Sequence, residues 1–349
     1  MFFLHKTIYA WLGILSLCLC WGSSVNAQII KDESLGAEAS IVKPNIDIKG
    51  LPADLIEGGA KRGINLFHSF REFNIDDSQR VYFSNPSGIE NILTRVTGGK
   101  ISNILGTLGV DGSANLFLIN PTGILFGENA KLDLNGSFVG TTADAIKFGE
   151  DRLFNVNSPD IPSQLLTVNP SAFLFNQIQA GKIENRSISP TPGNLLEDTL
   201  FGLRVNDGRS LIILGGEIAI DGGGLQAPGG RIELAGVVGE TIALEINGNN
   251  LSLKVPQDIE RADISLSNQA FVNSSGSGGG VINVWGKNIR VRDGSQIAAT
   301  TLGTIPGGGL TVNASELLEL TGASADKLLS SGLFTQTGAS GNAGDLKIT

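Results

Sequence analysis

The chain has 349 residues, including 47 glycines, and carries 25 Lys and Arg against 34 Asp and Glu. Its net charge of −9, with no cluster of basic residues, argues against a nucleic-acid partner and against binding to anionic membrane surfaces. With two cysteines and two histidines, the sequence offers no disulfide framework and no metal-binding motif, so we expect no cofactor or metal.

Residues 1–27 have the pattern of a secretory signal peptide. Lys6 supplies the positive charge, residues 7–21 are apolar, and a small-x-small motif places the cleavage site after Ala27. The apolar run is shorter than the 18 or more residues that a membrane-spanning helix needs. Cleavage would remove both cysteines and leave His68 as the one histidine of the mature chain.

Short apolar alternations separated by Gly, Asn and Asp run through the rest of the chain and predict many short strands. Residues 64–73 alternate apolar and polar positions, which is typical of a half-buried strand. His68 lies in this stretch, and we interpret it as a hydrogen-bonded structural residue. Only residues 91–96 and 314–320 have a period compatible with a helix, and both stretches are short.

The most distinctive repeat is a corner in which Asn-Pro is followed, after one residue, by Gly-Ile. The first copy recurs at an offset of 35 residues, and the two sets are Asn85, Pro86, Gly88, Ile89 and Asn120, Pro121, Gly123, Ile124. A fainter third copy begins at Asn169. A type I turn favours Asn first, Pro second and Gly fourth, so both full copies are predicted to be tight turns between strands.

Units this short cannot bury an apolar face alone and must stack on their neighbours. Because crossovers between parallel strands are right-handed, the pattern predicts an all-β fold, a right-handed parallel β-helix or solenoid. At about 22 residues per rung, the mature chain would form about 14 rungs. The corner residues Asn85, Asn120 and Asn169 are expected to stack into a side-chain ladder.

A second repeat has the form Gly-Gly-x-Ile. Its apolar column comprises Ile218, Ile232, Ile282, Leu310 and Leu346, at steps of 14, 50, 28 and 36 residues. An irregular period is typical of rungs that carry loops of variable length. Alternation along each strand predicts that these side chains point into the helix: Ile218, Ile220, Ile232, Leu234, Ile282 and Val284.

Residues 144–170 and 187–194 are more polar and contain closely spaced prolines, which indicates excursions from the rungs. We place a soft boundary near residue 200. The predicted organisation is a signal peptide at 1–27, an N-terminal domain at 28–200 and a repetitive region at 201–349.

Three stretches resemble a known family. They are NLFHSFREFNI (65–75), YFSNPSGIENILTRVTGG (82–99) and ANLFLINPTGILFGENAKLDLNGSFVGTT (114–142). These are similar to the N-terminal two-partner secretion domain of filamentous haemagglutinin exoproteins, closely over residues 33–175 and more loosely beyond. The corners here are NPSGI and NPTGI, where other members have NPNL and NPNGI. No role of that second asparagine can therefore be carried over.

The resemblance implies that residues 28–200 are the secretion domain and that residues 201–349 begin a β-helical passenger. Because the chain stops directly after a repeat strand, we expect it to be either a fragment or a short member of a family whose proteins are usually much longer. The implied partner is an outer-membrane Omp85-type transporter with periplasmic POTRA domains, and the implied location is the cell surface or the medium. The expected secretion motif is the eight corner residues already named: Asn85, Pro86, Gly88, Ile89, Asn120, Pro121, Gly123 and Ile124.

By the same resemblance the passenger would be an adhesin or haemagglutinin, with surface glycans or proteins of a host or a neighbouring cell as partners. Two alternatives stay open. One is a structural surface-matrix protein, and the other is a β-helical polysaccharide lyase or hydrolase. The best local cluster for catalysis is Asp258, Glu260, Arg261 and Asp263, but nothing pairs it with a second site. We therefore do not expect an enzyme.

Overall fold

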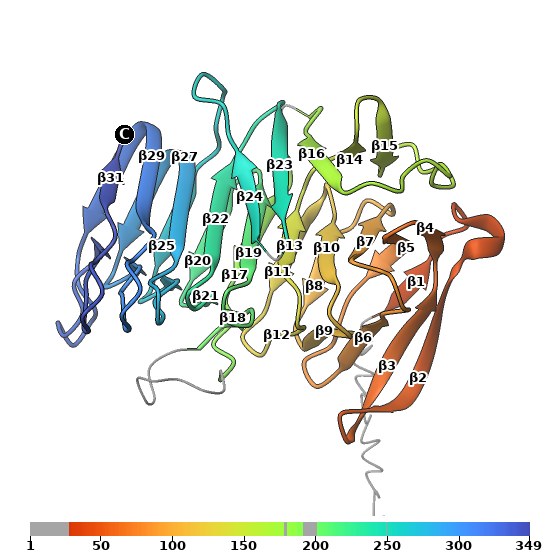
Figure 1. The fold of residues 1–349 in the computed structure, drawn as a ribbon, viewed down its shortest axis with the longest axis horizontal. Helices are drawn as coiled ribbons and strands as arrows, with labels where there is room; N and C mark the ends of the chain where they lie inside the picture. The colour runs from red at the N-terminus through yellow and green to blue at the C-terminus, as the bar shows by residue number, and fades with distance from the viewer. Residues whose placement is uncertain (1–27, 178–179, 191–200, 249) are drawn as a thin grey trace, which may run out of the picture.

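A computed structural model describes residues 28–177, 180–190, 201–248 and 250–349. The predicted signal peptide and the cleavage site at Ala27 lie outside these residues. Parallel strands stack along one long axis with the N-terminal rungs at one end and the C-terminal rungs at the other (Figure 1). The described part of the chain has 31 strands and one short 3-10 helix, η1 (Gly36–Glu38). This confirms the predicted parallel β-helix.

Three faces form the coil, and most turns of the chain contribute a strand to each face. The main face consists of β5 (Asn65–Phe73), β7 (Asn91–Val96), β10 (Asn115–Ile119), β13 (Phe138–Thr141), β19 (Ser210–Gly215), β22 (Arg231–Gly236), β27 (Val281–Arg292), β29 (Gly309–Thr321) and β31 (Leu346–Ile348). The second face consists of β8 (Ser102–Ile104), β11 (Gly123–Phe126), β17 (Lys182–Asn185), β20 (Ile218–Asp221), β25 (Ile264–Ser267) and the C-terminal halves of β27 and β29.

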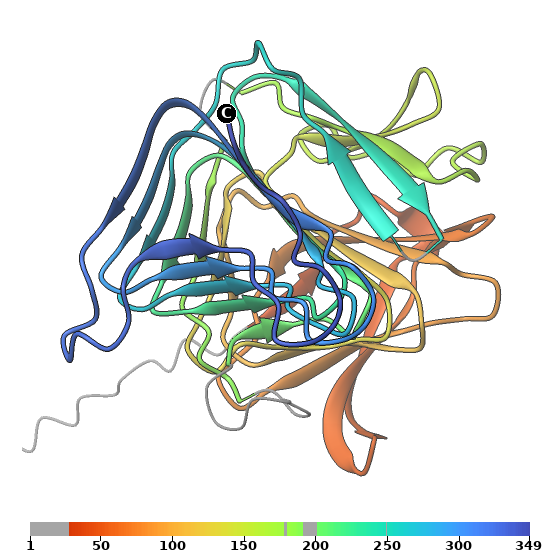
Figure 2. The ribbon, with the colours of Figure 1, turned by 60° about the vertical axis from the view of Figure 1, so that its left-hand side comes forward.

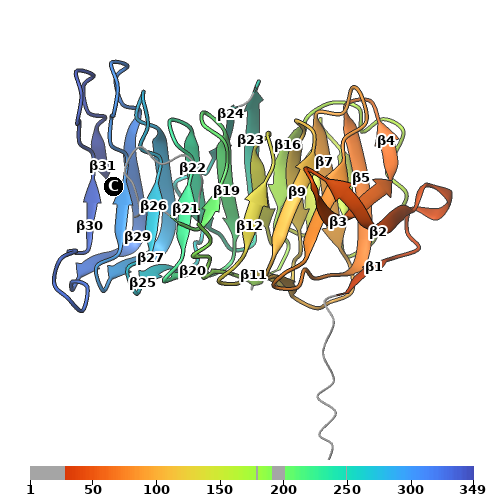
Figure 3. The same ribbon diagram turned by 90° about the horizontal axis from the view of Figure 1, so that it is seen from below.

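The third face is interrupted near its middle. Its N-terminal part contains β2 (Ser40–Ile48), β3 (Leu51–Gly58), β6 (Arg80–Ser84), β9 (Thr107–Asp111) and β12 (Lys131–Asp133). Its C-terminal part contains β18 (Leu203–Arg204), β21 (Gly224–Gln226), β26 (Phe271–Asn273), β28 (Gln296–Ala298) and β30 (Gly332–Phe334). Figure 3 looks onto this face and shows both parts along the coil.

The rung period differs from the sequence repeat. Neighbouring rungs are related by 26, 24 and 22 residues at Asn65–Asn91, Asn91–Asn115 and Asn115–Ser137. The 35-residue offset between the Asn-Pro corners is therefore not a rung. The main face has the nine strands named above and not about 14, because long excursions take up the remaining residues. Residues 91–96 and 314–320, the two stretches of helical period, lie in strands β7 and β29.

The second repeat is mostly a true rung repeat. Ile232, Ile282, Leu310 and Leu346 lie in register on the main face. Ile218 does not belong to this column, because β20 pairs with β17 and β25 on the second face. All six side chains predicted to point inward are at most 1% exposed and belong to the central core: Ile218, Ile220, Ile232, Leu234, Ile282 and Val284.

An antiparallel sheet covers the outer side of the main face over its N-terminal half (Figure 2). It consists of β14 (Ala145–Phe148), β15 (Arg152–Asn155), β16 (Pro170–Leu174), β23 (Thr241–Asn247) and β24 (Asn250–Lys254). A second hydrophobic core lies between this outer sheet and the coil. Residues 144–170 leave the coil as predicted, but they supply core residues such as Phe148 and Phe154.

The outer sheet changes the environment of β5. The sequence predicts a half-buried strand at residues 64–73, but Asn65–Phe70 is buried on both sides. Leu66 and Phe70 enter the central core, whereas Phe67 enters the second core and meets Phe154 at a ring-centroid distance of 4.8 Å. The covering strands come from distant parts of the sequence, so the local alternation could not show them.

The N-terminal segment caps the coil. Strand β1 (Ile29–Lys31) and strand β4 (Ala60–Arg62) pair antiparallel with β5, and β2 folds back on β3. The free edge strand β2 carries Pro44 and a register shift at Asn45, whose φ is +57°. A proline and a bulge on an edge strand oppose pairing with another chain. Within the described residues, no helix is long and apolar enough to span a membrane.

Candidate functional site

The first corner joins β6 on the third face to β7 on the main face, and Asn85 fixes its position. Asn85 Oδ1 accepts hydrogen bonds from the backbone N–H groups of Ser113 (2.8 Å) and Ala114 (3.0 Å) in the next rung. Its Nδ2 donates to the Ile89 carbonyl at 3.0 Å. A Cβ at Gly112 would lie 2.3 Å from Asn85 Oδ1, so the contact requires glycine there.

The turn at this corner is shifted by one residue from the prediction. The hydrogen bond that closes it runs from the Ile89 N–H to the Pro86 carbonyl (3.1 Å), so the turn starts at Pro86 and not at Asn85. Gly88 has φ +79°, as the third position of a type II turn requires. Asn85 is therefore a tie between rungs, and none of its described side-chain hydrogen bonds is to the Ser87 N–H.

The second corner joins β10 on the main face to β11 on the second face and follows the prediction. The Gly123 N–H donates to the Asn120 carbonyl (3.1 Å), and Asn120 Oδ1 accepts from the Thr122 N–H (3.0 Å). Asn120 Nδ2 also donates to the Lys100 carbonyl and to Ser102 Oγ, each at 2.9 Å. This corner is thus both a turn and a tie to the preceding rung.

The two corners differ in exposure. Pro86, Ser87 and Gly88 are exposed at the first corner. Asn120, Pro121, Gly123 and Ile124 are buried at the second, where only Thr122 is exposed. Ile89 and Ile124 both enter the central core. The eight predicted motif residues therefore do not form one surface: they lie at two different edges of the coil, and most of them stabilise the fold.

The predicted ladder exists, but other asparagines form it. Asn91 Nδ2 donates to Asn65 Oδ1 (3.0 Å), and Asn115 Nδ2 donates to Asn91 Oδ1 (3.0 Å). Asn115 Oδ1 then accepts from the Ser137 N–H at 2.9 Å. Asn85 and Asn120 take no part, because they lie at other edges. The sequence did contain a signal, since Asn65, Asn91 and Asn115 each begin a strand and precede two apolar residues.

Asn169, in the third copy of the corner motif, lies outside the coil. It precedes strand β16 of the outer sheet, and its Oδ1 accepts a hydrogen bond from Asn91 Nδ2 at 2.9 Å. Asn65 Nδ2 similarly donates to the carbonyls of Leu166 and Val168. The ladder thus attaches the excursion to the main face, and the third copy is not a rung corner.

A partly buried polar clamp ties the N-terminal segment to the coil and to the outer sheet. Asp32 accepts hydrogen bonds from Ser34, Ser69 and Thr97 at 2.6–3.0 Å. Burial alone would raise the pKa of Asp32, but these hydrogen bonds lower it below its ordinary value. The carboxylate is therefore ionised at neutral pH.

Arg95 completes the clamp from strand β7 and is 1% exposed. Its guanidinium donates to Ser69 Oγ (2.8 Å), Ser34 Oγ (2.7 Å) and the carbonyls of Asn155 (2.7 Å) and Asp160 (2.9 Å). It also lies 4.5 Å from the centroid of the Phe154 ring. Burial lowers the pKa of Arg95 to about 10, so it stays charged at neutral pH. The clamp joins three separate segments of the chain.

His68 is a structural residue, as predicted. It is 0% exposed, and its Nδ1 lies 2.9 Å from Ser40 Oγ. Its ring packs 5.1 Å from the Phe83 ring. Burial lowers the pKa of His68 to about 3, so the imidazole is neutral at physiological pH.

The acidic cluster weighed for catalysis does not converge. Arg261 is 3% exposed and turns to the Asn313 carbonyl (3.2 Å), whereas Asp263 lies on the outer surface and pairs with Arg290 at 3.0 Å. Burial would raise the pKa of Asp263, but hydrogen bonds from Asn288 and Arg290 lower it, the reverse of what a general acid needs. Within the described residues, no group of three or more His, Cys, Asp or Glu could hold a metal ion.

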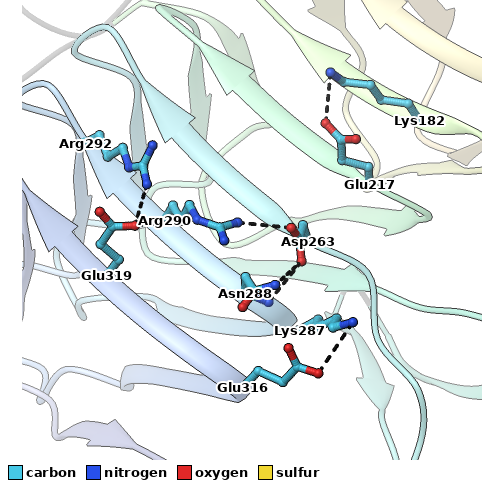
Figure 4. Close-up of polar contacts among 9 residues, drawn as sticks. All are labelled: Lys182, Glu217, Asp263, Lys287, Asn288, Arg290, Arg292, Glu316 and Glu319. Atoms are coloured by element: carbon cyan, nitrogen blue, oxygen red, sulfur yellow. Dashed lines mark hydrogen bonds and ion pairs between the residues drawn. The ribbon is translucent and has the colours of Figure 1, made fainter.

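Asp263 belongs instead to a row of charge pairs on the second face (Figure 4). Lys182 pairs with Glu217 at 3.0 Å, and Arg290 lies 3.5 Å from Glu319 as well as close to Asp263. Most of these side chains are between one quarter and three fifths exposed. Exposed pairs contribute little stability each, so the row is interpreted as the solvated surface of stacked rungs.

Comparison with known proteins identifies the family of the chain. A family model described as the TPS secretion domain matches residues 27–284. The chain is 32% identical over 88 residues to the heme/hemopexin-binding protein of Haemophilus influenzae, which is 25% of this chain and 9% of that relative.

Two solved structures are similar to this chain. The HMW1 secretion domain from Haemophilus influenzae matches with a TM-score of 0.51 and 21% identity, over 82% of this chain and 70% of that one. The filamentous hemagglutinin secretion domain matches with a TM-score of 0.43 and 14% identity, over 92% and 99%. The HMW1 domain supports the fold. Because the family match covers more than half of its residues, the chain belongs to the TPS secretion domains, the secretion domains of two-partner secretion exoproteins.

Proposed function

We propose that residues 28–200 carry the features that an outer-membrane transporter recognises when this exoprotein crosses the periplasm. The partner implied by the family is an outer-membrane transporter, and we propose an Omp85-type β-barrel with POTRA domains. We propose the division at residue 200 as a functional boundary and not as a structural one. The coil passes this point without a break, since β13 pairs in parallel with β19 across the intervening excursion.

The exposed first corner is the observation that supports this proposal. Pro86, Ser87 and Gly88 stand in solvent on a loop whose base Asn85 fixes. In the described part of the chain, the Ser87 hydroxyl has no hydrogen-bond partner, and only its carbonyl accepts a hydrogen bond, from Lys61 Nζ at 3.2 Å. Binding residues are often carried on loops that a rigid scaffold positions. The buried second corner would then affect secretion only through the stability of the fold.

A matched pair of substitutions tests this division. Ser87 and Thr122 occupy the same position of the two Asn-Pro-x-Gly corners, and both are exposed. Ser87→Lys and Thr122→Lys should each leave the unfolding midpoint nearly unchanged, since exposed positions usually tolerate substitution within about 0.5 kcal/mol. With the partner transporter present, Ser87→Lys should reduce the secreted yield severalfold and Thr122→Lys should not.

The pair is informative whether the transporter recognises a folded or an extended chain, because neither side chain is needed by the fold. Equal secretion of Ser87→Lys and wild type would show that the first corner is not recognised. Equal loss in both variants would indicate a general intolerance of added charge.

We further propose that the exported protein acts as an adhesin toward glycans or proteins of a host or neighbouring cell surface. In the C-terminal half the stacked rungs form long outer faces that the outer sheet does not cover. Attachment of wild-type protein to intact cells, compared with protein carrying changes on those faces, tests this part.

A further inference from the structure

A pocket of about 300 Å³ opens on the third face in the C-terminal half of the coil, over strands β26 and β28. Figure 3 shows this stretch of the face, where β21, β26 and β30 follow one another. The residues that decide its chemistry are Phe201, Phe271, Gln269, Asn273, Gln296 and Leu329. None of its described lining residues is charged.

The aromatic part of the pocket lies on the outside of the coil. Phe201 and Phe271 meet edge to face, with ring centroids 4.8 Å apart and an interplanar angle of 82°. A Cβ at Gly224 would lie 2.6 Å from the Phe271 ring, so glycine makes room for the ring on the outer surface of β21. Both phenylalanines are half-buried, which leaves part of an aromatic surface accessible.

Amide groups surround this aromatic surface. Gln269 is exposed, and its side chain makes no hydrogen bond within the described part of the chain. Gln296 Nε2 donates to the Ser330 carbonyl (3.2 Å), which leaves Oε1 as an acceptor. Asn273 Oδ1 accepts from the Ser275 N–H (2.7 Å), which leaves Nδ2 as a donor. The pocket therefore presents both donors and acceptors without charge.

Backbone conformation places one of these amides at the rim. Asn268 and Gln269 have φ +58° and +62° in succession. Left-handed conformations of residues other than glycine are uncommon and are often retained at functional sites. The tight turn that contains them sets Gln269 beside Phe271 at the start of β26.

A longer loop forms one wall. The two preceding rungs turn tightly before β26 and β28, but residues 322–331 form a loop closed by a bridge between Ala323 and Ser330. This loop brings Leu329 to the pocket. Its neighbour Leu328 is 81% exposed and does not line the pocket, so the two leucines form a matched pair for testing.

The geometry points to a binding site for a neutral hexopyranose unit of a glycan. One side of a pyranose ring is rich in C–H groups and can pack on an aromatic ring, while its hydroxyls both donate and accept hydrogen bonds with amides. The volume is at the lower end of the range for small-molecule sites, which suits one sugar ring. An acidic sugar would bury its carboxylate beside no cation, which is unfavourable. This inference rests on the proposed adhesin role and specifies its ligand class.

Saturation-transfer NMR on the purified exported protein tests the inference directly. The probes are methyl glycosides of glucose, galactose and mannose, with methyl glucuronide as the charged comparison. At least one neutral glycoside should receive saturation, and the glucuronide should bind more weakly. Gln269→Ala and Leu329→Ala should each weaken binding by about threefold to tenfold, the effect of one hydrogen bond or one apolar contact. Leu328→Ala should leave binding unchanged.

Several outcomes would overturn the inference. They are the absence of saturation for all three neutral glycosides, equal binding of the glucuronide, and equal weakening by Leu328→Ala and Leu329→Ala. Purified protein is used, so a failure of the transporter proposal would leave this result unaffected. Conversely, secretion of Gln269→Ala at the wild-type level would separate the pocket from export.

Discussion

The N-terminal and C-terminal rungs share one backbone geometry but differ in how they are stabilised. In the N-terminal rungs the main face is buried on both sides, as β7 and β10 show along their whole length. In the C-terminal rungs β27 alternates buried and partly exposed residues, because the outer sheet does not extend that far. The asparagine ladder and the Asp32–Arg95 clamp both lie in the N-terminal half.

The two halves are therefore distinguished by what covers the coil and not by the coil itself. A second core and two polar networks make the N-terminal rungs sensitive to substitution. The exception is where the outer side is free of contacts, as at the first corner. In the C-terminal rungs one side of the coil is exposed to solvent. Residues of the charge pairs and of the pocket on that side can be substituted without disturbing the core. Substitutions should therefore have unequal effects in the two halves.

The largest effect should come from breaking the clamp. Arg95→Met would leave the half-buried Asp32 without its charged neighbour and would remove four hydrogen bonds of a fully buried guanidinium. Loss of one partner from a buried charged network costs about 3–5 kcal/mol. The matched control is Arg292→Met in the C-terminal half, where the side chain is 45% exposed. Chemical denaturation should show a large loss for the first variant alone, and similar midpoints for both would contradict the comparison.

The boundary between the halves should be sensitive to pH through Glu233 on β22. This residue is 0% exposed and accepts hydrogen bonds from Arg231 (3.0 Å) and Asn283 (3.2 Å). Burial raises the pKa of Glu233 from its ordinary 4.5 to about 7. The folded state therefore binds the proton more tightly than the unfolded state, so stability falls as pH rises from about 4.5 to 7.

The size of this pH effect follows from the shift. A difference of this order corresponds to about 3 kcal/mol between pH 5 and pH 8. Glu233→Gln should remove that pH dependence, measured as the free energy of unfolding at the two pH values. A variant that loses as much stability as wild type between pH 5 and pH 8 would show that Glu233 is not the titrating group.

A smaller effect should come from the ladder. Asn91→Ala leaves the buried Asn65 and Asn115 each with an unpaired group, also removes the hydrogen bond to the exposed Asn169, and should cost about 2 kcal/mol. Asn129→Ala serves as the control, since this exposed residue bonds only to Asp77 among the described contacts. If both variants unfold at the same denaturant concentration, the ladder does not stabilise the N-terminal half.

The smallest effect should come from the exposed charge pairs of the second face. Arg290→Ala removes contacts to Asp263 and Glu319 that are partly open to solvent. Such pairs contribute about 0–1 kcal/mol and are screened by salt. The variant should unfold within that range of wild type, and the difference should shrink at 1 M NaCl. A loss of several kcal/mol would mean that the C-terminal half depends on these pairs.

The sequence predicted the coil well where the signal was local. Alternation identified inward residues such as Ile232 and Val284, and isolation of His68 from other ligands indicated its structural role. It failed where the answer depended on distant strands. Residues 144–174 bury Phe67, and the backbone N–H of Ser113 that donates to Asn85 Oδ1 lies in the next rung.

The ladder was misassigned for a related reason. Asn-Pro corners resemble one another because each ends a strand, yet Asn85 and Asn120 end strands on different faces. Alignment on the strand starts at Asn65, Asn91 and Asn115 would have given the rung period directly. The signal was present, but turn residues are more conspicuous than a single asparagine before two apolar residues.

We propose that the transporter recognises the first corner, whereas the second corner maintains the fold. The most direct test plots secreted yield against unfolding midpoint for Ser87→Lys, Asn85→Ala, Asn120→Ala and Asn169→Ala with the transporter present. We predict that the three asparagine variants lose secretion in proportion to lost stability, with Asn120→Ala among the most destabilised. We predict that Ser87→Lys loses secretion at wild-type stability. If all four variants fall on one line of yield against stability, the transporter does not recognise the first corner.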